Sequence, residues 1–141
     1  MTTKVILPNE LILEEAGKLL AEGREVVITP LGNSMLPFIR GGQDEVTLKA
    51  KSHVDVGEIV LARLPGPRYV LHRVIDRNRS LLVLMGDGNL KGTETCTRDD
   101  VMGTVTTING IPPGDGLFWR YLKPFRRILL AIYRRKNGIK S

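Results

Sequence analysis

Hydrophobic and polar residues follow two different patterns along this chain, and the change comes near residue 24. Between Asn9 and Ala21 the apolar residues recur at helical spacing, with Asn9 suited to the N-cap and Gly23 to the position after the last turn. We therefore predict a short helix over residues 9–21. Its apolar stripe should pack on the rest of the domain and consists of Ile12, Ala16, Leu19 and Leu20.

After this helix, short β-branched runs are separated by glycine, proline and charged residues, which is typical of strands. The predicted strands cover residues 25–29, 44–49, 58–63, 68–76, 81–85 and 101–108. Pro65-Gly66-Pro67 between two of these runs indicates a tight turn and antiparallel pairing. Because no helix of crossover length separates the runs, we predict a mostly β fold with peripheral helices rather than a parallel α/β sheet.

The end of the chain differs from the rest in charge. A breaker segment at residues 109–116 precedes it, so we expect one domain over residues 1–116. Residues 117–141 hold 8 of the 21 Lys and Arg residues and none of the 15 acidic ones, and their apolar residues follow helical spacing. We predict a basic amphipathic helix. It packs on the domain or a partner, or residues 117–136 contact an anionic membrane, with Trp119, Tyr121 and Phe125 at headgroup level.

Composition narrows the classes of function. The body of the chain is slightly acidic, and too few residues precede the first strand for a helix-turn-helix unit, so we expect no specific nucleic-acid binding. His53, His72 and Cys96 match no zinc spacing, and we expect no metal or other cofactor. Cys96 is the only cysteine and should lie in a polar loop. Without an apolar run of signal-peptide or membrane-spanning length, the expected location is cytoplasmic, with peripheral membrane contact left open.

Three residues occur in the order of a hydrolytic triad: Ser34, His72 and Asp87. A neutral imidazole can take the proton of a serine hydroxyl and so create a nucleophile. Gly32 would let the chain turn closely before Ser34, whose backbone N–H is the natural oxyanion donor, with Asn33 as a second. Each residue alone has an ordinary structural interpretation, as a turn serine, a half-buried strand histidine and a turn aspartate.

The combination of short motifs over about residues 25–108 resembles the S24/S26 peptidase superfamily, which includes signal peptidases and LexA-type self-cleaving repressors. The motifs are Gly-Asn-Ser-Met-Leu-Pro at 32–37, Gly-Gly-Gln-Asp-Glu-Val at 41–46, Val-Gly-Glu-Ile-Val at 56–60, Leu-His-Arg-Val at 71–74, Met-Gly-Asp-Gly-Asn at 85–89 and Asp-Val-Met-Gly-Thr-Val at 100–105. His72-Arg73 is similar to the archaeal and endoplasmic-reticulum branch, in which histidine replaces the lysine base.

This resemblance implies a coiled, mostly antiparallel β-structure and a serine endopeptidase acting on a peptide or protein substrate. Ser34 would be the nucleophile and His72 the general base. Asp87 would orient the imidazole, with Asp99 and Asp100 in reserve because the acidic pair that follows this motif in the histidine branch is missing here. The membrane helix typical of signal peptidases is replaced by the short acidic helix at 9–21. The alternative is therefore an inactive peptide- or protein-binding module of the same fold.

Overall fold

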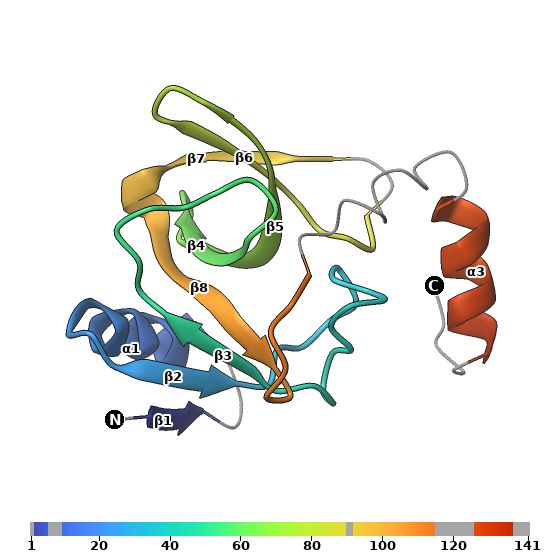
Figure 1. Cartoon of the computed structure of the whole chain (residues 1–141), viewed down its shortest axis with the longest axis horizontal. Coiled ribbons are helices and arrows are strands. Elements are labelled where there is room, and N and C mark those ends of the chain that lie inside the picture. Colours follow the sequence, from blue (N-terminus) through green and yellow to red (C-terminus); the bar gives the residue numbers. More distant parts are fainter. Residues whose placement is uncertain (1, 6–9, 90–91, 115–125, 137–141) are drawn as a thin grey trace.

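In the computed structural model, which describes residues 2–5, 10–89, 92–114 and 126–136, one sheet curls into a half barrel with helices at its periphery (Figure 1). The predicted fold class, mostly β with peripheral helices, is confirmed. The strands are β1 Thr2–Val5, β2 Glu25–Ile28, β3 Val46–Lys49, β4 Ile59–Leu64, β5 Arg68–Asn78, β6 Leu81–Met85, β7 Glu94–Thr97 and β8 Val101–Ile108. The helices are α1 Glu10–Ala21, the short 3-10 helix η1 Arg98–Asp100, and α3 Arg126–Lys136.

The strands lie in the order β1-β2-β3-β8-β4-β5-β6-β7, and every neighbouring pair except β1 and β2 is antiparallel. Strands β4 to β7 follow one another as a meander that makes the curl, and β8 returns to lie between β3 and β4. The parallel β1–β2 pair is joined through α1, so the expectation that no helix crosses between strands is wrong at this edge. A four-residue strand of sequence Thr-Thr-Lys-Val carries little hydrophobic signal of its own.

Two hydrophobic clusters hold the sheet together. One lies between α1 and the sheet, where Ala16 and Leu20 are fully buried against β2, β3, β4 and β8, as the predicted helical stripe requires. The other fills the inside of the curl formed by β4 to β7. Its members are Val54, Val60, Ala62, Leu64, Val70, Val74, Leu82, Leu84, Cys96 and Val101. Full burial of an aliphatic side chain is worth about 1.5–3 kcal/mol, so both layers contribute strongly.

The six predicted strands all form, with ends within two residues of the expected ones. The sequence-based prediction missed β1 and β7. Cys96, expected in a polar loop, lies in β7 and is only 4% exposed, because alternation within Glu94–Thr97 turns it toward the curl. Burial, helped by the negative charge of Asp100, raises the pKa of the Cys96 thiol to about 11.

Within the predicted basic segment the structure describes α3, and residues 117–125 and 137–141 lie outside the described part, Trp119, Tyr121 and Phe125 among them. Leu130 is 3% exposed and packs with the buried Leu36, with Tyr133 against the same cluster. Neither of the two longer described helices is long and apolar enough to cross a membrane.

Candidate active site

His72 comes from the middle of β5, and a carboxylate reaches it from β7. Val74 pairs with Leu84 of β6, and Leu84 pairs with Glu94 of β7, so Glu94 is on the same face of the sheet as Val74 and His72. His72 Nδ1 lies 2.5 Å from Glu94 Oε1, and because a carboxylate accepts hydrogen bonds, Nδ1 carries the hydrogen. The two side chains are 8% and 19% exposed. Because Nδ1 is occupied in this way, Nε2 is the nitrogen left to accept a proton.

Ser34 lies in the loop between β2 and β3, and two glycines let the end of β6 approach it closely. The Gly88 N–H donates to the Ser34 carbonyl at 2.8 Å. A Cβ on Gly86 would lie 2.4 Å from that same oxygen, and a Cβ on Gly88 would lie 2.6 Å from the Asn33 carbonyl. Only glycine fits at these two places. The Gly-Asp-Gly segment therefore fixes the backbone of the serine loop.

The loop is closed at its base by Asp44, which is 3% exposed. Its carboxylate accepts hydrogen bonds from the backbone and side chain of Arg40, at 2.7 Å and 2.8 Å, and from Asn109 at 3.0 Å. Burial acts to raise the pKa of Asp44, but the hydrogen bonds from Arg40 and Asn109 outweigh it and hold the pKa below its usual value. The loop between β2 and β3 that carries Ser34 is thus held to the sheet by Asn109, the residue directly after β8.

One cavity of about 450 Å³ brings the two halves of the site together. Ser34 and Gly32 line it from the loop, His72 and Glu94 from the sheet, and Asn89 from the segment after β6. Leu13, Ile28, Leu61 and Leu71 are among the residues that make the rest of the wall apolar. In the described part of the chain the Ser34 hydroxyl makes no hydrogen bond to the imidazole; such bonds commonly tighten only when substrate binds.

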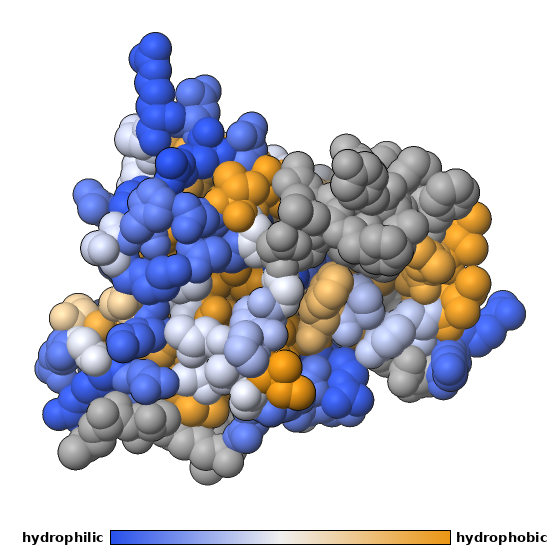
Figure 2. Space-filling model, in the orientation of Figure 1, coloured by the Kyte–Doolittle hydropathy of each residue, from blue (hydrophilic) through white to orange (hydrophobic). Residues whose placement is uncertain are grey.

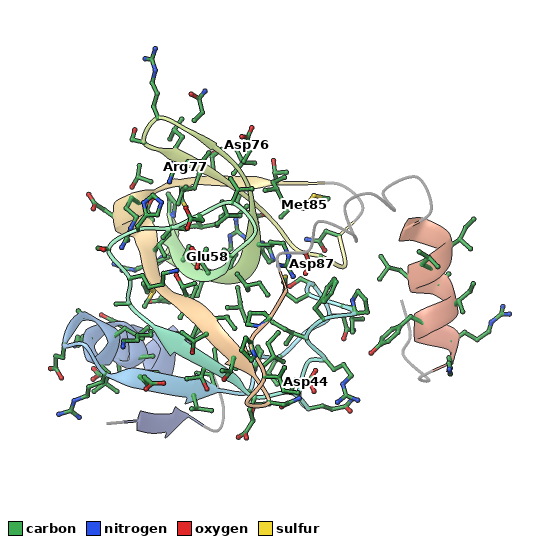
Figure 3. All side chains as sticks on the ribbon, in the orientation of Figure 1. Asp44, Glu58, Asp76, Arg77, Met85 and Asp87 are labelled. Atoms are coloured by element: carbon green, nitrogen blue, oxygen red, sulfur yellow. The ribbon has the colours of Figure 1, made fainter. Side chains whose placement is uncertain are left out.

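Asp87, the acid expected beside His72, instead lies against Arg73. Figure 3 shows Asp87 beside the serine loop, beyond the end of β6. Its carboxylate accepts hydrogen bonds from Arg73 Nε at 2.9 Å and Nη2 at 2.7 Å. Arg73 also donates to the Gly57 and Gly114 carbonyls and lies over the Phe38 ring. Neighbouring residues of β5 point to opposite faces, so the carboxylate that pairs with Arg73 is on the other side from His72.

The reserve acids are also elsewhere. Asp99 and Asp100 belong to η1 and line a separate groove with Arg63 and the Pro65–Pro67 turn. Asp100 accepts the backbone N–H and hydroxyl of Thr97. Asn33 is exposed and is not among the residues that line the cavity in the described structure, whereas Gly32, with a φ of 84°, is.

Sequence reasoning missed two residues of this site, Glu94 and Asn89. Glu94 was overlooked because β7 was not predicted: Glu-Thr-Cys-Thr has one apolar residue, which is too little alternation to indicate a strand. Asn89 ends the Met-Gly-Asp-Gly-Asn motif at 85–89, but the sequence alone indicates no role for its side chain. The Asn89 backbone N–H donates to the Gly86 carbonyl, which folds the turn back toward the cavity.

Among the described strands, none pairs with the edge of β5 that lies beside the cavity. Pairing with β6 covers Arg73 to Asn78, while Arg68 to His72 pair only with β4 among the described strands. Arg68, Tyr69, Val70, Leu71 and His72 all line the cavity. Unpaired backbone groups in such a position can hold an extended peptide by strand addition.

Comparison of the chain with protein-family models and with curated proteins gives no match.

Proposed function

We propose that this chain is a serine endopeptidase of the S24/S26 type that cleaves a peptide or protein precursor, with Ser34 as nucleophile and His72 as general base. One observation carries the proposal: residues 38 positions apart in the sequence line one cavity, and the partly buried carboxylate of Glu94 is within hydrogen-bond distance of the imidazole there. The orienting acid in this proposal is Glu94, in place of Asp87, because Glu94 is the carboxylate on His72 and Asp87 is held by Arg73.

In the proposed reaction, His72 Nε2 takes the hydroxyl proton of Ser34 as Oγ attacks the substrate carbonyl. The oxyanion would accept the Ser34 backbone N–H, which donates to no other group among the described backbone hydrogen bonds. The imidazolium then gives its proton to the leaving amine, and an ester forms on Ser34. Water, deprotonated by His72, hydrolyses that ester and restores the hydroxyl. The Glu94 carboxylate accepts the hydrogen bond from His72 Nδ1–H throughout and stabilises the imidazolium that forms in each step.

The proposed substrate is an extended segment laid along the open edge of β5. Backbone hydrogen bonds to residues 68–72 would hold it, and the apolar wall around Leu13, Ile28 and Leu61 would select a hydrophobic or small side chain near the cut. Arg68 and Glu94 are the charged residues that line this cavity in the described structure, and Glu94 is engaged with His72.

A fluorophosphonate probe located by mass spectrometry tests the proposal. We expect labelling of Ser34 that disappears in Ser34→Ala and in His72→Ala, and both variants should lose peptide cleavage while keeping the wild-type circular dichroism spectrum. Matched controls are Ser80→Ala and His53→Ala, which change an exposed serine and an exposed histidine outside the cavity. Label that persists on Ser34 without His72, or that falls on another serine, contradicts the proposal.

A second candidate is an inactive peptide-binding module of the same fold. The observation that favours it is the missing hydrogen bond between the Ser34 hydroxyl and His72 in the described part of the chain. It predicts that a peptide binds in the cavity with the same affinity in wild type and Ser34→Ala, with no cleavage and no labelling in either protein.

A further inference from the structure

Helix α3 exposes an apolar face that the serine-loop cavity does not use. Ile128 is 60% exposed, Ile132 58% and Leu129 36%. At about 3.6 residues per turn, Ile128 and Ile132 lie side by side on one face of α3, opposite Leu130 and Tyr133, which pack toward Leu36. Figure 2 shows hydrophobic atoms at the outer edge of the molecule, in the region where Figure 1 draws α3. Of the other exposed large hydrophobic residues in the described structure, Leu31 and Phe38 share the loop between β2 and β3, and Val56, Leu81 and Ile111 lie singly elsewhere.

The charged residues of α3 itself all have one sign. Arg135 and Lys136 are exposed at the end of α3, and the sequence from 117 to 141 contains eight basic residues and no acid. Within α3, exposed apolar side chains are thus combined with exposed positive charge. A helix of this kind binds in the interface of a membrane that carries anionic lipids, with its apolar side chains among the acyl chains and its cations at the headgroups.

A nucleic acid and a second copy of α3 fit this face of the helix less well than a membrane does. A nucleic acid would use the cations but would leave Ile128 and Ile132 in contact with water or phosphate. A second copy of α3 would bring two groups of positive charges together, and like charges repel. An anionic bilayer satisfies both the apolar and the basic residues at once.

We propose that α3 binds the surface of anionic membranes through Ile128, Ile132, Arg135 and Lys136. Its opposite face packs through Leu130 on Leu36, two residues after Ser34, so a bound helix would hold the serine loop next to the membrane surface. The membrane binding itself does not depend on the proposed peptidase activity, and it is measured without any substrate.

Co-sedimentation of the full chain with vesicles tests this. We expect binding to phosphatidylcholine vesicles containing about one-third phosphatidylglycerol, weak binding to phosphatidylcholine alone, and loss of binding at high salt. The pair Ile128→Ser/Ile132→Ser and the pair Arg135→Gln/Lys136→Gln should each weaken binding about tenfold or more. Leu81→Ser/Ile111→Ser and Lys49→Gln/Arg63→Gln, which change exposed residues of the sheet domain, should stay within about twofold of wild type.

Each result that contradicts the membrane proposal has its own interpretation. No binding to anionic vesicles, equal binding to neutral ones, or replacement of both isoleucines without loss overturns the proposal. If only the Arg135→Gln/Lys136→Gln pair matters, and a DNA duplex binds with the same dependence, the surface serves a nucleic acid instead. Thermal unfolding of each variant shows whether the sheet domain is intact, and probe labelling of Ser34 reports separately on the peptidase proposal.

Discussion

The chain has two histidines, and each lies within hydrogen-bond distance of a carboxylate, yet their surroundings differ completely. His53 Nε2 is 2.6 Å from Asp55 Oδ1, with side chains 62% and 61% exposed. His72 Nδ1 is 2.5 Å from Glu94 Oε1, with side chains 8% and 19% exposed, and it lines the cavity that also contains Ser34.

The two histidine–carboxylate contacts are almost equally short, so it is burial rather than distance that separates them. An exposed pair is screened by water and orients little, whereas a buried pair in a low-dielectric wall fixes the ring and strengthens every interaction inside the cavity. His53 and Asp55 are two residues apart in one loop, while His72 and Glu94 are brought together by three paired strands.

The largest effect should come from the carboxylates of the two pairs. Glu94→Gln should lower kcat by about 10³–10⁴-fold, because an amide no longer fixes the Nδ1–H tautomer or stabilises the imidazolium. Asp55→Asn should leave kcat unchanged. Steady-state kinetics with one peptide substrate make the comparison, and circular dichroism checks the fold. Equal rates for Glu94→Gln and wild type would remove Glu94 from the mechanism.

The next effect concerns stability rather than rate. Asp87→Ala would leave the Arg73 guanidinium, whose side chain is 1% exposed, without its carboxylate, so we expect a loss of about 3–5 kcal/mol in the free energy of unfolding. Asp99→Ala changes an exposed acid with no described partner and should cost less than about 0.5 kcal/mol. Urea denaturation measures both. A small loss at Asp87 would mean that water or a neighbouring group takes over its role.

The third prediction concerns Gly86, which lies directly after β6 against the carbonyl of Ser34. If His72 acts on Ser34, a change that moves the Ser34 backbone should slow the reaction. Gly86→Ala would place a methyl group against the Ser34 carbonyl and should reduce kcat by about 10²-fold. The loss should appear in kcat more than in KM, because the open edge of β5 is unchanged. Gly114→Ala adds a methyl group in open space and is the matched control. Wild-type kcat in Gly86→Ala would show that the loop tolerates movement.

The smallest expected effect is the acid sensitivity of Asp44, whose carboxylate holds the loop between β2 and β3 to Asn109. Because the pKa of Asp44 is lowered in the folded protein, its stabilisation is present above the ordinary value of 3.8 and is lost as pH falls below it. Asp44→Asn should therefore be about 1–3 kcal/mol less stable than wild type at pH near 7, and the difference should shrink below about pH 4. Urea midpoints over this range test it. A constant difference would assign the effect to packing.

Much of the fold could be predicted because its strongest elements have local signals. The apolar stripe of α1 and the alternating strands β5 and β8 are recorded directly in the order of residue types. The short strands β1 and β7 could not be found this way, because four residues give too little alternation and are stabilised mainly by pairing with their neighbours.

The candidate site likewise contains two residues that local motifs indicate and one that depends on how the strands pair. Ser34 and His72 could be singled out from motifs, and the structure places them on one cavity. The choice between Asp87 and Glu94 could not be made, because it depends on which face of β5 each carboxylate approaches. Position 87 lies on the Arg73 side, and position 94 reaches His72 only through the register of β6 with β7.

If the proposed peptidase function holds, the edge at residues 68–72, which pairs only with β4 among the described strands, also limits when a substrate can be cut. A strand edge accepts only a backbone that is already extended and has its own hydrogen-bonding groups free, and a helix or an interior strand offers neither. Five residues of edge span about 16 Å, so a segment of about five extended residues would be needed. Cleavage would then act on a newly made chain before it folds, or on a tail or linker that never does.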